Sequence, residues 1–171
     1  MASLIVSNTD FTEAYSIATD VFTSAELDAF IELNEKKLLY ELFGVELADL
    51  FIADLSNGQP QTQRFIDVFA LFYKQFDDTN NEIFISEGIK TMLVKYIYFI
   101  YARQQSQNNA IMGNVQSQST INNPSAMNYA TLVLRYNEMI DTFNAIQQFI
   151  DENKSVYPEY KGVCKNYITL I

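Results

Sequence analysis

Catalysis in this chain would have to rely on carboxylates, a few cations and one thiol, because its 171 residues include no histidine. Histidine is the commonest general base, a member of serine and cysteine triads, and a ligand in most zinc sites. The five glycines, at positions 44, 58, 88, 113 and 162, lie too far apart for a phosphate-binding loop or a dinucleotide fingerprint. The sequence therefore predicts no catalytic residue, no cofactor and no enzymatic activity.

Two acidic clusters have spacings that invite comparison with a metal site or an acid–base pair. Asp78 to Glu82 would supply oxygen ligands at the first, third and fifth positions of a calcium loop. Ile83, however, stands where that loop needs glycine, and Ile89 where it needs a bidentate glutamate. Glu138 and Asp141 lie one helical turn apart, but no second acidic pair accompanies them on that helix. Both clusters are interpreted as solvated surface, and no metal site is predicted.

One thiol and a group of tyrosines are the other side chains that could do chemistry. Cys164 has no histidine partner, and although Lys161 and Lys165 could activate it, a structural role as a buried small side chain, or an incidental one, is favoured. The tyrosines could stack on nucleic-acid bases. Since isoleucines and a phenylalanine separate them, a place in the core or in an interface is favoured for all three: Tyr96, Tyr98 and Tyr101.

Composition and charge limit the classes of partner. Apolar residues make up 49% of the chain and aromatic residues 14%, which is ample material for a core. The net charge of −10 repels nucleic acid at long range and disfavours free binding to it. The N-terminal residues lack the basic region of a signal peptide, and the longest apolar run, Met92 to Ala102, is shorter than the roughly 20 residues that span a bilayer. No membrane association is expected.

The hydrophobic pattern predicts a mainly α fold: one domain over residues 1–171 whose core is a small helical bundle at about 24–152. A capping-box spacing at Thr23 and Glu26 starts the first helix, and Gly44 ends it, with Glu35 on its solvent-facing side. The segment from Phe65 to Phe76 fits a helix or a buried extended strand, and a helix is favoured. Residues 77–82 are expected to form a polar loop. Helices are expected at 23–43, 45–55, 65–76, from Ser86 to about 105, and at 124–153.

Two segments outside this helical pattern are candidate interfaces. Residues 104–125 are rich in Gln, Asn and Ser and carry no charge, which predicts either a mobile surface loop or an arm, such as a hairpin turning near Gly113, that orders against a neighbour. The tail, residues 154–171, is basic and aromatic in an otherwise acidic chain. The predicted interface residues are the apolar residues of the arm and the tyrosines of the tail: Ile111, Met112, Val115, Ile121, Tyr157, Tyr160 and Tyr167.

The order of these elements resembles a known family. The sequence Ile85-Ser86-Glu87-Gly88-Ile89-Lys90 precedes the run MLVKYIYFIYARQQ, a charge-free loop containing Gly113 and Val115, and the long helix NYATLVLRYNEMIDTFNAIQQFI. Over about Ser24 to Glu152 this arrangement is similar to the head–tail connector (adaptor or ring) proteins of tailed bacteriophages, particularly those of crAss-like and related phages of Bacteroidetes hosts. The chain departs from that pattern in the segment from Phe65 to Glu82 and in its tyrosine-rich tail.

The resemblance implies a structural virion protein of the phage neck. Such a protein forms a homo-oligomeric ring, commonly of twelve subunits, that joins the portal and other neck or tail proteins and surrounds a channel through which DNA passes without specific binding. It assembles in the host bacterial cytoplasm. Two rivals remain open: an acidic module that sequesters a basic protein, for which the charge of −10 is the supporting feature, and a metal-dependent enzyme that uses carboxylates alone.

Overall fold

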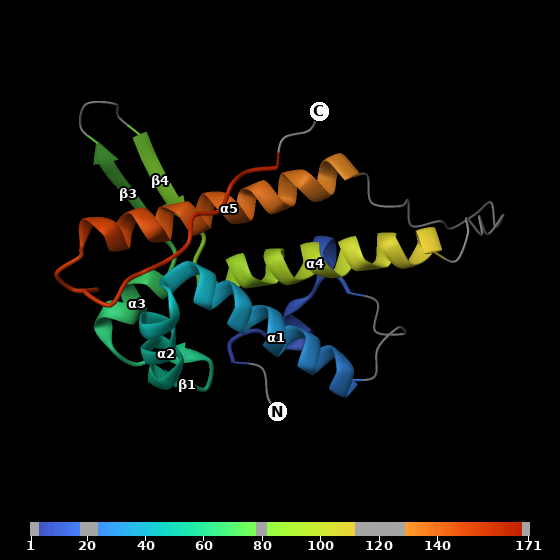
Figure 1. The fold of residues 1–171 in the computed structure, drawn as a ribbon, viewed down its shortest axis with the longest axis horizontal. Coiled ribbons are helices and arrows are strands. Elements are labelled where there is room, and N and C mark those ends of the chain that lie inside the picture. The colour runs from blue at the N-terminus through green and yellow to red at the C-terminus, as the bar shows by residue number, and fades with distance from the viewer. Residues whose placement is uncertain (1–3, 18–23, 78–81, 112–128, 169–171) are drawn as a thin grey trace.

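The computed structural model describes residues 4–17, 24–77, 82–111 and 129–168, and these form a mainly helical fold (Figure 1). Two 3₁₀ turns, Asn8–Asp10 and Glu13–Tyr15, precede the first helix. The α-helices are α1 (Ser24–Phe43), α2 (Val45–Asp54), α3 (Gln63–Phe69), α4 (Ile89–Ile111) and α5 (Tyr129–Glu152). The strands form two antiparallel hairpins: β1 (Leu55–Ser56) with β2 (Gln59–Pro60), and β3 (Phe72–Asp77) with β4 (Glu82–Ser86).

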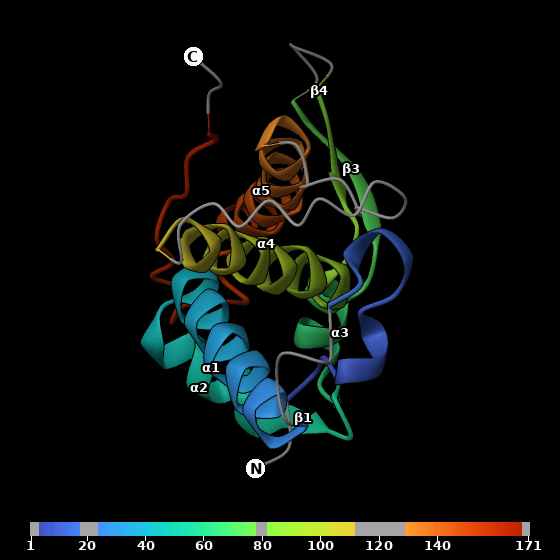
Figure 2. The same ribbon diagram turned by 90° about the vertical axis from the view of Figure 1, so that its right-hand side faces the viewer.

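Helices α4 and α5 lie side by side at the centre, with α1 packed against α4 (Figures 1 and 2). From Ile89 to Ala102, α4 is apolar nearly all round, as the sequence predicts, and its three tyrosines at 96, 98 and 101 are buried. The heptad-like seam of α5 also faces the core, through Leu132, Met139, Phe143, Ile146 and Ile150. Within the described part of the chain, no helix combines the length and the apolar character that crossing a bilayer requires.

The turn between α1 and α2 depends on Gly44. This residue has a φ of +79°, a backbone conformation that is energetically unfavourable for residues with a Cβ atom. A Cβ atom added there would lie 2.7 Å from the carbonyl oxygen of Lys161, so the glycine also permits the C-terminal tail to pass close to the turn. The predicted helix stop at Gly44 is therefore confirmed, and the tail is a second reason for it.

The helix favoured over 65–76 is wrong in its second half. Helix α3 ends at Phe69, and the chain then forms β3, which pairs with β4 so that Tyr73 lies opposite Ile85. Phe72 packs against Phe149 of α5 with ring centroids 5.3 Å apart, whereas Tyr73 faces outward. This alternation is the two-residue period of a strand whose inner face packs on a helix.

The expected helix start at Ser86 is also wrong, because Ser86 ends β4 and α4 begins at Ile89.

Glu35 does not lie on the solvent-facing side of α1, as the sequence pattern had indicated. Its side chain is fully buried, and its carboxylate accepts hydrogen bonds from the backbone N–H groups of Leu4, Ile5 and Val6 at 2.8, 3.0 and 2.5 Å. Burial raises the pKa of Glu35, against the lowering effect of these three donors. Glu35 thus fastens the N-terminal segment, residues 4–17, to the helical core.

Part of the predicted arm is helical. Helix α4 continues to Ile111, so that residues 104–111 belong to this helix rather than to a loop. Residues 112–128 lie outside the described residues. They include Met112, Val115, Ile121, the turn expected near Gly113, and the first residues of the helix expected from 124.

Candidate functional site

The C-terminal tail, described over residues 154–168, turns back from the end of α5 and runs along that helix without regular secondary structure (Figure 1). Tyr157 fixes the turn: its ring is buried in the core and its hydroxyl donates a hydrogen bond of 2.5 Å to the carbonyl oxygen of Arg64. Burial, with a contribution from Asp67, raises the pKa of Tyr157 to about 12. The ring of this predicted interface tyrosine therefore packs in the core of the chain itself.

Beyond Tyr157 the tail binds mainly through its backbone. The N–H groups of Lys161 and Val163 donate to the carbonyl oxygens of Phe43 (3.1 Å) and Glu41 (2.8 Å) in the last turn of α1. These carbonyls have no partner within their own helix, since the last four C=O groups of a helix lack one. The tail therefore acts as the C-terminal cap of α1.

Four polar side chains of α5 follow the tail along one face of the helix. Asn137, Asp141, Asn144 and Gln147 are spaced four, three and three residues apart, the spacing of one helical face. Asn137 forms two hydrogen bonds with the backbone of Ile168, at 2.9 and 3.0 Å. At the other end of the row, Gln147 donates to the carbonyl oxygens of Leu42 and Val163. We call this row the α5 polar stripe.

Tyr167 is the predicted interface tyrosine that is most exposed, at 52%. Its hydroxyl donates to Asp141 of the polar stripe at 2.9 Å, and Asn144 approaches the same hydroxyl at 3.5 Å. Tyr160 is half-buried, and burial raises its pKa to about 12. Of the arm residues, Ile111 is the last residue of α4, whereas Met112, Val115 and Ile121 lie outside the described residues.

An ion pair between Lys165 and Glu41 joins the tail to α1. The Nζ atom of Lys165 lies 2.5 Å from an oxygen of Glu41 and sits over the rings of Tyr96 and Phe143. That oxygen of Glu41 is buried and has no hydrogen bond of good geometry, so the ammonium charge of Lys165 is what neutralises it. This partly buried ion pair thus contributes to holding the tail against α1.

Replacing Asn137 with alanine is expected to loosen the tail while leaving the helical core folded. Loss of two hydrogen bonds costs about 1–2 kcal/mol of local stability, which corresponds to roughly tenfold faster opening. Hydrogen exchange at the amide of Val163, which lies in the tail five residues before Ile168, measures that opening. Asn144→Ala is the matched control on the same stripe, because its bond to Tyr167 is long. Equal protection of Val163 in both variants and the wild type would exclude a clamping role for Asn137.

Two surfaces expose apolar side chains. The hairpin face consists of Leu71, Tyr73 and Ile85, which are 54%, 65% and 46% exposed, beside a hollow of about 390 Å³ between α3 and the strand. The α2–tail face consists of Val45 and Val163 around a hollow of about 550 Å³ that Tyr40, Glu46, Asp49 and Lys161 also line. Figure 2 shows α2 and the tail on one side of the central helices and the hairpin on the other.

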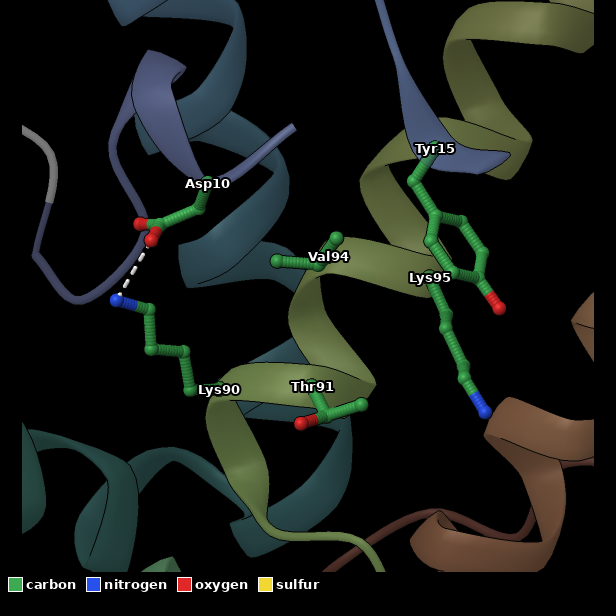
Figure 3. Close-up of a pocket in the computed structure, with 6 residues that line it drawn as sticks. All are labelled: Asp10, Tyr15, Lys90, Thr91, Val94 and Lys95. Atoms are coloured by element: carbon green, nitrogen blue, oxygen red, sulfur yellow. Dashed lines mark ion pairs between the residues drawn. The ribbon is translucent and has the colours of Figure 1, made fainter. Parts of the chain in front are cut away.

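A third hollow, of about 290 Å³, lies between the N-terminal segment and α4 (Figure 3). Lys90 forms an ion pair with Asp10 at 2.8 Å across it. Lys95 is 7% exposed and lies 2.6 Å from Glu87 and 3.3 Å from Glu138. Burial disfavours its charged form, but the hydrogen bond and charge of Glu87 outweigh this effect and raise the pKa of Lys95. Both lysines serve as ion-pair links between elements of the fold.

The acidic pair identified in the sequence does not converge on one site. Glu138 contacts Lys95, whereas Asp141 contacts Tyr167 of the tail, so the two carboxylates serve different neighbours. Among the described residues, no three acidic or cysteine side chains come together in a way that would hold a metal ion. Cys164 is exposed on the tail, so the expectation that it is buried is wrong. What sequence reasoning missed is the groove under the tail, although the spacing of the α5 polar stripe was a signal for it.

The described surface thus carries two exposed apolar faces, and the C-terminal tail packs on α1 and α5 through backbone hydrogen bonds. Comparison with known proteins adds no family to this description, because no family model, no curated protein and no solved structure matches the chain.

Proposed function

We propose that this protein is a structural component of a bacteriophage neck, where identical subunits associate side by side in a ring between portal and tail. The observation that carries the proposal is the position of the two apolar faces on opposite sides of the central helices. Solvent-exposed Tyr73 on the hairpin face of one subunit inserts into the hollow beside Val45 and Val163 on the next. Tyrosine is well suited to this role, since it combines a large apolar ring with a polar tip.

Two different faces that bind each other generate a directional interface. Such a head-to-tail contact closes into a ring when the rotation between neighbours divides a full turn. A single self-complementary patch would instead give a twofold dimer. The hairpin face and the α2–tail face differ in shape, composition and secondary structure, which favours the ring.

The place of the ring in a virion rests on the resemblance of the sequence to head–tail connectors. The net charge of −10 is compatible with the wall of a DNA channel, because phosphate binding needs the lysine and arginine contacts that this chain has few of. In this proposal the helical bundle supplies a rigid wall, and residues 104–125 contact a neighbouring subunit or the portal.

Deleting residues 110–123 tests the assembly role of the arm. Only the last residues of α4 are lost from the described fold, so the shortened protein is expected to remain folded, with the thermal transition of the wild type. Phage particles that carry it are expected to accumulate as unjoined heads and tails, counted by electron microscopy. Normal joining of heads to tails by the deletion variant would exclude this role.

A further inference from the structure

We propose that Asp49 selects tyrosine as the side chain that enters the α2–tail face: its carboxylate accepts a hydrogen bond from the Tyr73 hydroxyl of a second copy of this chain. This inference rests on the association proposed above and names the polar contact that fixes one subunit on the next. The two faces carry complementary groups. Of the three side chains that define the hairpin face, only Tyr73 has a polar atom, whereas two carboxylates line the hollow of the other face.

The hollow of the α2–tail face has an excess of negative charge. Glu46 and Asp49 of α2 line it, and Lys161 is the one cation among its lining residues in the described part of the chain. The Nζ atom of Lys161 lies 3.9 Å from a carboxylate oxygen of Glu46, and both side chains are largely exposed. Asp49 forms no ion pair with any described residue. A donor that approaches this hollow is therefore favoured over an acceptor.

Asp49 is also half engaged. Its Oδ1 atom accepts a hydrogen bond of 2.6 Å from the hydroxyl of Tyr40, and no described residue donates to its Oδ2 atom. An ionised carboxylate has about four lone-pair sites on its two oxygens, so Asp49 can accept a second hydroxyl without releasing Tyr40. The existing bond shows that this carboxylate accepts a tyrosine hydroxyl, and it restricts the side chain of Asp49 to one direction.

Apolar walls lie next to this acceptor. Val45 and Asp49 are four residues apart and lie on the same side of α2, about 6 Å apart along the helix axis. Val45 and Val163 are 67% and 57% exposed, so an aromatic ring that enters beside them covers apolar surface. The hydroxyl of the ring then reaches Asp49. Phenylalanine would cover the same valines but leave the carboxylate desolvated without a donor, which is unfavourable.

The directional character of the interface allows one copy of it to be isolated. Changing Val45 and Val163 to glutamate blocks the α2–tail face and leaves the hairpin face intact. Changing Tyr73 and Ile85 to glutamate does the reverse in a second protein. Mixed together, the two blocked proteins are expected to form a one-to-one pair and no larger assembly, because the two remaining faces are blocked. Analytical ultracentrifugation measures the dissociation constant of the pair, and thermal transitions check that each protein is folded.

A double-mutant cycle in this pair tests the contact. Tyr73→Phe in the first protein and Asp49→Ala in the second are each expected to raise the dissociation constant about tenfold, since a hydrogen bond to a charged group is lost. Both changes together are also expected to raise it about tenfold, instead of the roughly hundredfold of two independent effects. Glu46→Ala is the matched control on the same helix, and its effect is expected to multiply with that of Tyr73→Phe. Tyr40→Phe controls for the bond within the subunit and is expected to leave the constant unchanged.

The outcomes separate this inference from the proposed ring. A one-to-one pair in which Tyr73→Phe has no effect, or in which the effects of Tyr73→Phe and Asp49→Ala multiply, overturns the role of Asp49 and leaves the interface intact. Absence of any pair between the blocked proteins, at concentrations where the wild type assembles, overturns the interface and this inference together. A wild-type protein that remains monomeric at every concentration likewise overturns both.

Discussion

Replacing Glu35 with alanine is expected to destabilise the protein by about 3 kcal/mol or more, because three backbone N–H groups in or near the core lose their acceptor. Each buried donor left without a partner costs roughly 1–3 kcal/mol. The N-terminal segment held by Glu35 also contributes buried Ile5 and Val6, so its release removes apolar packing as well. Chemical denaturation measures the change in the free energy of unfolding.

Two variants make this result specific. Glu35→Gln retains one acceptor oxygen and is expected to lose less stability than the alanine variant. Glu32→Ala removes a glutamate one turn earlier on α1 that pairs with Lys36 at the surface, and its midpoint is expected to stay near that of the wild type. An alanine variant at position 35 with the stability of the wild type would show that the carboxylate does not hold the N-terminal segment.

The second large effect is expected on assembly. Changing both Tyr73 and Ile85 to glutamate places two charges at the centre of the hairpin face, where they would be desolvated against the next subunit. Central aromatic side chains of an interface cost 2 kcal/mol or more when lost, so the dissociation constant is expected to rise by at least about tenfold. Analytical ultracentrifugation over a range of concentrations measures this change.

Folding of the charged variant is checked by its thermal transition, which is expected to resemble that of the wild type because both side chains point away from α5. Leu33→Glu is the matched control, since Leu33 is 68% exposed on α1 and belongs to neither face. If the control disrupts assembly as strongly as the double variant, the effect is one of general charge repulsion. If the double variant assembles normally, the hairpin face is not the interface.

The helices were predictable because their signals are local. Capping residues, Gly44 and the apolar spacing identify α1, α2, α4 and α5, although α4 begins at Ile89 rather than Ser86 and continues to Ile111 rather than about 105. Strand β3 was not predictable in the same way, since its aromatic residues fit a helix or a strand equally well. The choice between helix and strand depends on contact with α5, through Phe72 and Phe149, which are far apart in sequence.

Glu35 shows why the solvent-facing side of α1 was assigned wrongly. A glutamate among charged neighbours is expected to be exposed. The partners of Glu35 are the backbone N–H groups of residues 4–6, which almost any residue type supplies, so the sequence does not identify them. The contacts of the tail were also not identifiable from the types of its side chains. Its tyrosines were singled out by type, yet Tyr157 is buried, and the groove contacts are made by Asn137 and Gln147, whose partners are backbone atoms.

The measurement that tests the proposed ring most directly is a cryo-electron microscopy reconstruction of the neck in virions that contain this protein. The account predicts a closed ring on the portal–tail axis, in which Tyr73 of each subunit lies against Val45 and Val163 of the next. A position away from that axis, or a ring in which the hairpin face is exposed to solvent, would contradict it.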